Sequence, residues 1–420
     1  MTAAGPQSAL VDDVQFCQAR SAVYVVFFGN GFLFANWAAR IPQVRAELGV
    51  TPGVLGLILL CLAVGSGVGT PLSGLIISRL GESRTVSVMA VIAAAGMAVA
   101  AVGVLLGTPA VAAGLLVFGF GSGTWDVAMN VQGAAIERAL GRAILPRFHA
   151  GWSIGTVAGA GIGAIMVVLG VPVTAHLLAV AVAVAIVMPV AARRFLPGTH
   201  APAPGGRSAR RRQLASWTEP RTLLIGLFVL CMALTEGTGN DWLSLAVIDG
   251  YHSAAVAGTL TFAVFLAAMT AGRWWGPGLI DRYGRVLVLR VCTVTALAGL
   301  LLIEFGGVLP AAMAGALLLG LGTSLGFPVG LSSAADDPAH AATRVSTAAS
   351  IGYVAFLAGP PVVGFLGDRV GVLRSLWVAA VVLAAAFLLA GFTAPLTAAG
   401  GPGPDGERGR ERSAGAGKTE

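Results

Sequence analysis

The stretch VSVMAVIAAAGMAVAAVGVLLG, Val86 to Gly107, contains no charged residue. As an α-helix it is about 33 Å long, which matches a bilayer hydrocarbon core of about 30 Å. A second run, Val173 to Ala192, also lacks Asp, Glu, Lys and Arg. Each run exceeds the roughly 18 residues that indicate a membrane-spanning helix. The two runs predict an integral membrane protein.

The composition of the whole chain supports the same class. Of 420 residues, 56% are hydrophobic and only 11% are charged, and the mean hydropathy is +0.85. Soluble domains carry about 25% charged residues, so this chain has too little charge to cover a surface that faces water. The first twenty residues show no cleavable signal peptide, and we expect the first apolar segment to be retained. The four scattered cysteines are expected to be buried apolar residues rather than disulfides or metal ligands.

Apolar length and flanking Gly, Pro and charge predict about twelve spans in an all-α integral membrane fold. The predicted spans are 21–40, 52–78, 85–107, 110–136, 148–169, 172–192, 222–247, 254–280, 286–305, 308–333, 344–367 and 372–394.

The positive charges between the spans predict the orientation. If successive loops alternate in side, one side carries only Arg40, Arg45, Arg369 and Arg374, and Arg273 lies inside a span. The positive-inside rule then places both termini in the cytoplasm. The net charge of +7 is explained by these loops, and we expect no nucleic-acid partner.

The hydrophilic stretch RRFLPGTHAPAPGGRSARRRQ lies near the middle of the chain. Its Pro, Gly, Ser and Arg content predicts a flexible cytoplasmic linker that separates six spans from six. The predicted organisation is a cytoplasmic N-terminus (1–20), a first six-helix half (21–192), a linker (193–221), a second six-helix half (222–396) and a disordered cytoplasmic tail (397–420).

Short matches in the same order indicate that the two halves are pseudo-repeats. SIGTVA in the fifth span recurs as SIGYVA in the eleventh, and Asn36-Trp37 in the first span has a counterpart in Asp241-Trp242 of the seventh. SRLGESR after the second span corresponds to DRYGR after the eighth. Two six-span halves around a linker are typical of secondary transporters, which bind their substrate between the halves near the midplane.

These residues resemble the major facilitator superfamily, whose signature Gly-x-x-x-Asp-Arg-x-Gly-Arg-Arg follows spans 2 and 8. The second copy is close to the signature, but in the first Ser78 stands where the motif has Asp. NGFLFANWAARIP, WDVAMNVQG and FHAGWSIG are also similar to an uncharacterised bacterial branch labelled YbjJ-like, which is related to fucose and other sugar proton symporters. The residues that the resemblance assigns to the gating-loop motif are Gly74, Arg79, Gly81, Asp281, Arg282, Gly284 and Arg285.

Asp126 and Glu137 belong to the segment GTWDVAMNVQGAAIER, which as a helix has one polar face. A charge at the bilayer centre costs at least about 2.5–3.5 kcal/mol. Asp126 lies deep in its span, and we interpret it as a substrate or proton site, or as a structural partner of a neighbouring helix. Glu137 is at the end of the same face, where it is either a proton site or gate or a solvated helix end.

The second half offers Glu236, with Asn240 one turn later on the same face. A buried glutamate can exchange protons near neutral pH, so Glu236 is the other principal candidate for proton coupling. His149 at the start of span 5 is a candidate proton relay or a hydrogen-bonded helix-start residue. Arg273 either pairs with a carboxylate of its own half or binds an anionic substrate.

The resemblance implies that spans 1, 4, 7 and 10 line a central cavity. The candidates to contact a substrate there are Asn30, Asn36, Trp37, Asn130, Asn240, Trp242 and Arg273.

We therefore expect a secondary active transporter in a bacterial inner (plasma) membrane, acting as a monomer that alternates access by rocking its halves. The resemblance implies proton-coupled symport of a sugar-like or other small polar solute. The alternatives are a proton-antiport exporter of drugs or metabolites, and a membrane sensor on a transporter scaffold. Exporters often carry Gly-Pro in span 5, and this span has no Pro. No metal cluster, nucleophile triad or nucleotide motif stands out, so neither an enzyme nor a cofactor nor a metal is expected.

Overall fold

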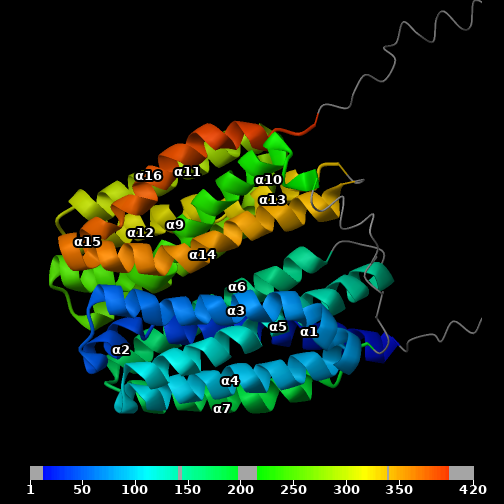
Figure 1. The fold of residues 1–420 in the computed structure, drawn as a ribbon, viewed down its shortest axis with the longest axis horizontal. Helices are drawn as coiled ribbons and strands as arrows, with labels where there is room; N and C mark the ends of the chain where they lie inside the picture. Colours follow the sequence, from blue (N-terminus) through cyan, green and yellow to red (C-terminus); the bar gives the residue numbers. More distant parts are fainter. Residues whose placement is uncertain (1–12, 141–143, 197–214, 338–339, 397–420) are drawn as a thin grey trace, which may run out of the picture.

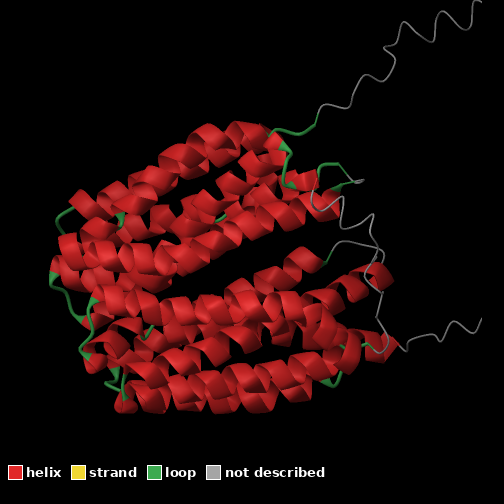
Figure 2. Cartoon of the chain, viewed as in Figure 1, coloured by secondary structure: helices red, strands yellow, loops and turns green. Residues whose placement is uncertain are grey.

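The computed structural model describes residues 13–140, 144–196, 215–337 and 340–396. Within these ranges the chain is helical and contains no strand (Figure 2). Twelve helices there are long and apolar enough to cross a membrane, which confirms the predicted class and number of spans. The tail at 397–420 and most of the linker lie outside the described residues.

Within each half, the helices follow one another along the chain with short connections (Figure 1). Those of the first half are α1 (Asp13–Ala38), α2 (Ile41–Leu48), α3 (Pro52–Leu80), α4 (Glu82–Leu106), α5 (Thr108–Leu140), α6 (Leu145–Val168) and α7 (Val173–Ala192). Those of the second half are α9 (Pro220–Tyr251), α10 (Ala255–Tyr283), α11 (Arg285–Phe305), α12 (Leu309–Thr323), α13 (Gly326–Ala334), α14 (Ala341–Val370), α15 (Val372–Ser375), α16 (Trp377–Leu389) and the 3₁₀ turn η1 (Ala390–Thr393).

Two features of the helices were not predicted. The first is the short helix α2, which follows the first span, has Pro42 in its first turn and ends at Gly49, whose φ is +63°. The second is an interruption of the tenth span between α12 and α13. Proline has no backbone N–H, so Pro328 cannot donate to the carbonyl of Ser324 four residues earlier. The helix is interrupted at that carbonyl.

The two halves form two helix bundles that lie side by side (Figure 1). Helix α3 packs against α14, and α6 packs against α10, across the boundary between them. We call the end at which α2 and α15 lie the α2 end, and the opposite end, which carries Arg79, Arg84 and Arg282, the arginine-rich end. In Figure 1 the ribbons of the two halves lie closest together at the α2 end.

Glycines allow close helix contacts within each bundle. A Cβ on Gly31 of α1 would overlap the carbonyl oxygen of Trp152 in α6, and a Cβ on Gly155 of α6 would overlap that of Phe28 in α1. The two helices therefore pack backbone to backbone, as in other membrane proteins where small residues line the contact. The outward faces carry exposed apolar side chains such as Leu106 and Leu388, each 73% exposed, which suits contact with lipid.

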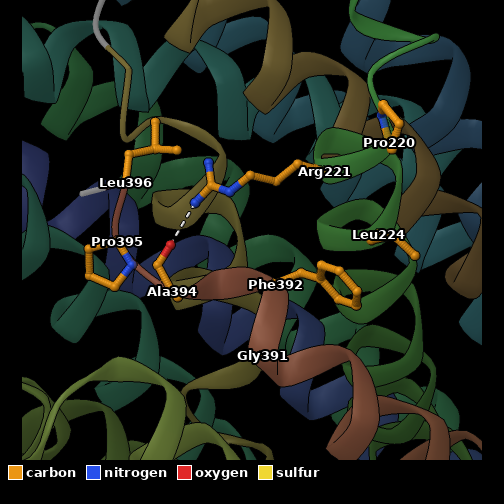
Figure 3. A pocket seen from close by; sticks show the side chains of 8 residues that line it. All are labelled: Pro220, Arg221, Leu224, Gly391, Phe392, Ala394, Pro395 and Leu396. Atoms are coloured by element: carbon orange, nitrogen blue, oxygen red, sulfur yellow. Dashed lines mark hydrogen bonds between the residues drawn. The ribbon is translucent and has the colours of Figure 1, made fainter. Parts of the chain in front are cut away.

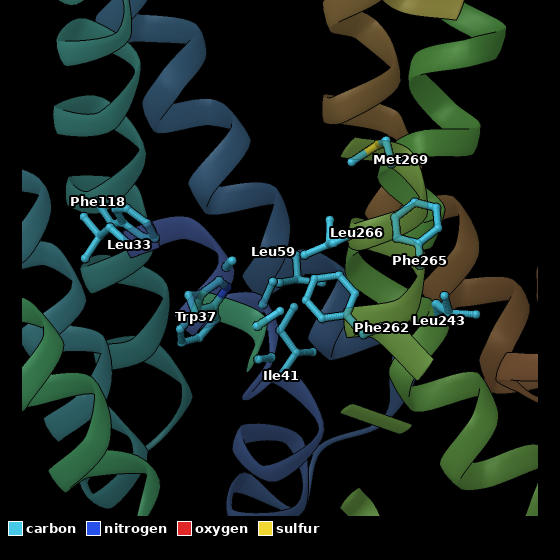
Figure 4. Close-up of a cluster of buried hydrophobic side chains, with 14 of the residues drawn as sticks. Leu33, Trp37, Ile41, Leu59, Phe118, Leu243, Phe262, Phe265, Leu266 and Met269 are labelled. Carbon is cyan, nitrogen blue, oxygen red and sulfur yellow. The ribbon is translucent and has the colours of Figure 1, made fainter. Parts of the chain in front are cut away.

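An apolar cluster crosses the boundary between the halves. Ile41 and Leu59 of the first half and Phe262 and Leu266 of the second are fully or almost fully buried in one cluster (Figure 4). Polar contacts lie at the surface of the same end. The Arg45 Nη1 atom is 2.5 Å from the Asp249 Oδ2 atom, and the backbone N–H of Gly53 donates to Asp368 at 3.0 Å. The α2 end is therefore closed.

Candidate functional site

Glu236 and Arg273 form an ion pair inside the second half. Glu236 lies near the middle of α9 and Arg273 in α10, and the distance from Arg273 Nη2 to Glu236 Oε1 is 2.8 Å. The side chains are 11% and 23% exposed, respectively. Pairing two opposite charges at this depth offsets much of the free energy that burying either charge alone would cost.

The same arginine contacts the interruption of the tenth span. Arg273 Nε donates to the carbonyl oxygen of Ser324 at 3.2 Å, the carbonyl that Pro328 leaves without its helical donor. The guanidinium therefore connects α9, α10 and the junction of α12 with α13. Of the two roles expected for Arg273, the geometry provides the pairing with a carboxylate of its own half.

Asp126 has a different environment near the middle of the 33-residue α5. Its side chain is partly buried, and no Lys, Arg or His of the described chain pairs with it. The Nδ2 of Asn130 donates to the backbone oxygen of Asp126 at 2.9 Å. Across the boundary, Asp126 interacts electrostatically with Tyr353 of α14. Asp126 is thus a deep carboxylate without a positive partner among the described residues.

Helices α6 and α10 bring further polar groups together at the boundary. The Thr270 hydroxyl lies 2.8 Å from the Leu266 carbonyl oxygen of its own helix and 3.5 Å from that of Ser153 in α6. His149 lies one turn before Ser153 and is exposed. Its ring packs edge-on against Phe27, with 5.2 Å between the ring centroids, and it interacts electrostatically with Arg273. His149 of α6 and Arg273 of α10 therefore lie on facing helices of different halves.

Asn30 joins three helices of the first half. Its Nδ2 donates to Ser122 Oγ in α5 at 3.3 Å, and its Oδ1 accepts from Trp152 Nε1 in α6 at 3.1 Å. The residue is 5% exposed. Asn30 therefore fixes the position of α5 near Asp126, with both ends of its amide already bonded.

Asn36 is bonded to groups within the first half. Asn36 is fully buried, and its Oδ1 lies 2.9 Å from His176 Nε2 in α7. Trp37 is 1% exposed. Nearby, Arg40 donates to the carbonyl oxygen of Val171. Asn36, His176 and Arg40 form a polar core between α1 and α7, which we assign to packing within the first half. Trp37 belongs to the apolar cluster of Figure 4.

In α9, Asn240 and Trp242 also differ from each other. Asn240 is partly buried, and its Oδ1 has no hydrogen-bond partner among the described residues. Trp242 is fully buried and packs against Gly364 of α14. Asn240 remains a candidate to contact a solute, whereas Trp242 is part of the contact between α9 and α14. Asp241 between them is a second partly buried carboxylate with no cationic partner in the described ranges.

Glu137 stabilises the start of the next helix. Its Oε2 accepts hydrogen bonds from the backbone N–H groups of Ile144 and Leu145, both at 2.8 Å. These are free donors at the N-terminus of α6. The contact accounts for Glu137 as a helix cap at the arginine-rich end.

The gating-loop residues of the two halves have different surroundings. In the first half, Gly74 has open space where a Cβ would lie, and Arg79 is exposed. In the second half, Asp281 and Arg282 are exposed, whereas Arg285 Nη1 pairs with Asp336 Oδ1 at 3.0 Å. Gly81 and Gly284 both end their helices with φ near +80°, a region that favours glycine.

Asp336 also binds Arg221, which lines a pocket of about 460 Å³ (Figure 3). Arg221 Nη2 lies 2.9 Å from Asp336 Oδ2, and it donates to the carbonyl oxygen of Ala394 at 2.8 Å. Asp336 was not singled out from the sequence, although its place directly after the tenth span was a usable signal. Ser122, Tyr353 and Thr270 gave no such signal, because single hydroxyl groups are common in spans.

Comparison with known proteins identifies the family. The model of the Major Facilitator Superfamily matches residues 23–277 and 242–418. An uncharacterised transporter, y4wD, of Sinorhizobium fredii is 31% identical over 346 residues, which is 81% of this chain and 89% of that protein. An uncharacterised MFS-type transporter of Yersinia pestis is 34% identical over 348 residues, with 82% and 88% covered.

Solved structures share the fold. The nucleoside transporter NupG, as a mutant, has a TM-score of 0.73 at 15% identity and covers 90% of this chain and 100% of its own. The E. coli fucose:proton symporter FucP has a TM-score of 0.62 at 17% identity, with 91% and 98% covered. The narrower YbjJ-like branch stays a prediction. The chain belongs to the Major Facilitator Superfamily and is a multi-pass membrane transporter of a small solute.

Proposed function

We propose that the protein is a proton-coupled symporter of a small, hydroxyl-rich solute, and that Asp126 binds the coupled proton. The observation that carries the proposal is the contrast between Asp126 and Glu236, the two carboxylates that lie near the middle of α5 and α9. Glu236 has Arg273 at 2.8 Å, whereas Asp126 has no cationic partner in the described chain. An unpaired charge there costs about 2.5–3.5 kcal/mol, and protonation removes that cost when water leaves the site.

The solute class follows from the groups at the boundary between the halves. Asn240 has a side-chain oxygen without a hydrogen-bond partner among the described residues, and the Glu236–Arg273 pair offers both an acceptor and donors. Such groups suit a polar solute that both donates and accepts hydrogen bonds, as a sugar does. The fold shared with the fucose:proton symporter is consistent with this class.

We further propose that the chain works as a monomer in a bacterial inner membrane, with the arginine-rich end in the cytoplasm. The basic residues at that end support this orientation through the positive-inside rule. The closed α2 end then faces the periplasm, and transport requires the halves to rock so that each end opens in turn.

The test is proton flux in proteoliposomes with a trapped pH dye, screened with sugars, sugar acids and amphipathic drugs. We expect that transport of one polar solute is accompanied by proton movement in the same direction. Asp126→Asn should abolish the proton flux but retain solute exchange, whereas Glu47→Gln, which alters an exposed carboxylate of α2, should leave both unchanged. Full coupling in Asp126→Asn would reject Asp126 as the proton site, and proton movement opposite to the solute would indicate antiport.

A further inference from the structure

Asp368 stabilises the start of a helix that belongs to the other half. Its Oδ1 accepts from the backbone N–H of Gly53 at 3.0 Å, and the Thr51 hydroxyl donates to its Oδ2 at 3.3 Å. Gly53 lies in the first turn of α3, where backbone N–H groups have no helical acceptor and favour a negative charge. We call this contact the Asp368 cap.

The residues around Asp368 repeat a pattern found at two other helix ends. Asp368-Arg369-Val370-Gly371 closes α14, Ser78-Arg79-Leu80-Gly81 closes α3 and Asp281-Arg282-Tyr283-Gly284 closes α10. The three glycines have φ values of +87°, +79° and +80°. The copy at the end of α14 was not recognised in the sequence as a motif.

Helices α3 and α14 run in opposite directions across the boundary between the halves, so the end of each points toward the start of the other. At the α2 end, Asp368 of α14 caps α3. At the arginine-rich end, the corresponding position of α3 is Ser78, whose hydroxyl donates to the carbonyl of Leu75 in its own helix at 2.8 Å. The N-terminus of α14 has no side-chain cap from its N-cap residue His340.

Glycines on one face of α3 show that the two helices touch at only one end. A Cβ on Gly56 would lie 2.5 Å from the carbonyl oxygen of Pro360 in α14, and one on Gly364 would lie 2.5 Å from that of Pro52. Further along the same face of α3, Gly67 and Gly74 have nothing within 4 Å of a Cβ. Only the α2 end of this helix pair is closed, and that is the end with the carboxylate.

We propose that the Asp368 cap holds the α2 end closed and that Ser78 leaves the arginine-rich end without an equivalent cap. The resting protein therefore favours the state that is open at the arginine-rich end. A pocket of about 810 Å³ borders the cap, lined from both halves by Arg45, Thr51, Asp249, Asp368 and Arg374. Water in this pocket can replace the Asp368 contact when the halves separate. The inference rests on the alternating access proposed above, but on neither the proton nor the solute.

The test measures the opening of the α2 end directly. Spin labels at Glu47→Cys and Ala254→Cys, exposed positions in different halves, report their separation by pulsed electron paramagnetic resonance, in lipid nanodiscs without solute and after replacement of the native cysteines. Asp368→Asn should raise the population with the longer distance about three- to tenfold. Ser78→Asp should shift it in the same direction, because it supplies a carboxylate at the other end.

Glu304→Gln is the matched control, since it removes a carboxylate at the α2 end that interacts with Arg374 and Trp377 of its own half, and it should leave the distances unchanged. An unchanged distance distribution in Asp368→Asn would overturn the inference, as would an equal shift in the control. If Asp368→Asn folds poorly, Ser78→Asp tests the inference by itself. An unchanged distance distribution in Ser78→Asp would then contradict the inference. If the distances shift but no solute drives proton flux, the proposal of proton coupling is rejected and the Asp368 cap is retained.

Discussion

Arg273 and Glu236 form an ion pair, 2.8 Å from Nη2 to Oε1, between two helices of the same half. Removing one partner leaves an uncompensated charge in a poorly hydrated place. We expect Glu236→Gln to lower the free energy of unfolding by roughly 2–4 kcal/mol, less than for a fully buried pair, because Arg273 retains some exposure.

The double variant Glu236→Gln/Arg273→Met should recover much of that loss, because it removes both charges. Thermal unfolding of the detergent-purified protein provides the measurement. Additive losses in the double variant would contradict a direct pairing between the two side chains.

The contact between α1 and α6 predicts different outcomes for two glycines of one helix. A Cβ at Gly155 would overlap the backbone of Phe28, whereas Gly161 has nothing within 4 Å. Gly155→Ala should destabilise the protein by about 1–3 kcal/mol through overpacking. Gly161→Ala should be neutral or slightly stabilising. Thermal midpoints of the two variants give the comparison, and equal effects would rule out this close contact.

The variant Glu137→Gln distinguishes two roles for Glu137, a helix cap and a proton site. Because Glu137 accepts two backbone hydrogen bonds at the start of α6, loss of its charge should lower the thermal midpoint by a few degrees. Coupled proton flux should persist. If flux is lost while the thermal midpoint stays unchanged, Glu137 belongs to the transport chemistry instead.

The pH dependence of stability has a specific source at Glu219, just before α9. The hydrogen bond from Arg344, whose Nε is 2.6 Å from Glu219 Oε2, lowers the pKa of this carboxyl group. A lowered pKa in the folded state gives stability that is complete above the unfolded value of about 4.3 and is lost as the pH falls through the folded value.

Thermal midpoints should therefore fall in mildly to strongly acidic buffer, and Glu219→Gln should reduce that fall. The variant should also be less stable than the wild type at neutral pH. A pH profile for Glu219→Gln that overlays the wild-type profile would exclude this contribution.

The spans could be predicted because apolar length and the flanking Gly, Pro and charged residues mark them. The faces of the helices were harder to assign, as Asn30 and Asn36 illustrate. They are six residues apart in one helix, which turns them about 240° from each other. Asn30 bonds to α5 and α6, and Asn36 faces α7. Both were expected at the central cavity, although helical periodicity already argued against a shared position.

The interruption of the tenth span shows the other limit of sequence reasoning. Pro328 predicts a free carbonyl at Ser324, but only the packing of α10 against α12 brings Arg273 to it. The partner of Arg273 was likewise one of two possibilities until the helices were placed. Short elements such as α2 carry too few residues for their apolar pattern to be distinguished from a loop.

The burial of Trp242 against Gly364 gives the protein an intrinsic optical reporter. Its ring is fully buried, and its indole N–H has no partner among the described residues, so its fluorescence should be emitted at short wavelength. Separation of α9 and α14 from the first half at the α2 end would admit water and move that emission to the red. With the other tryptophans of the eight replaced by phenylalanine, the transport cycle could be followed by fluorescence without an attached dye.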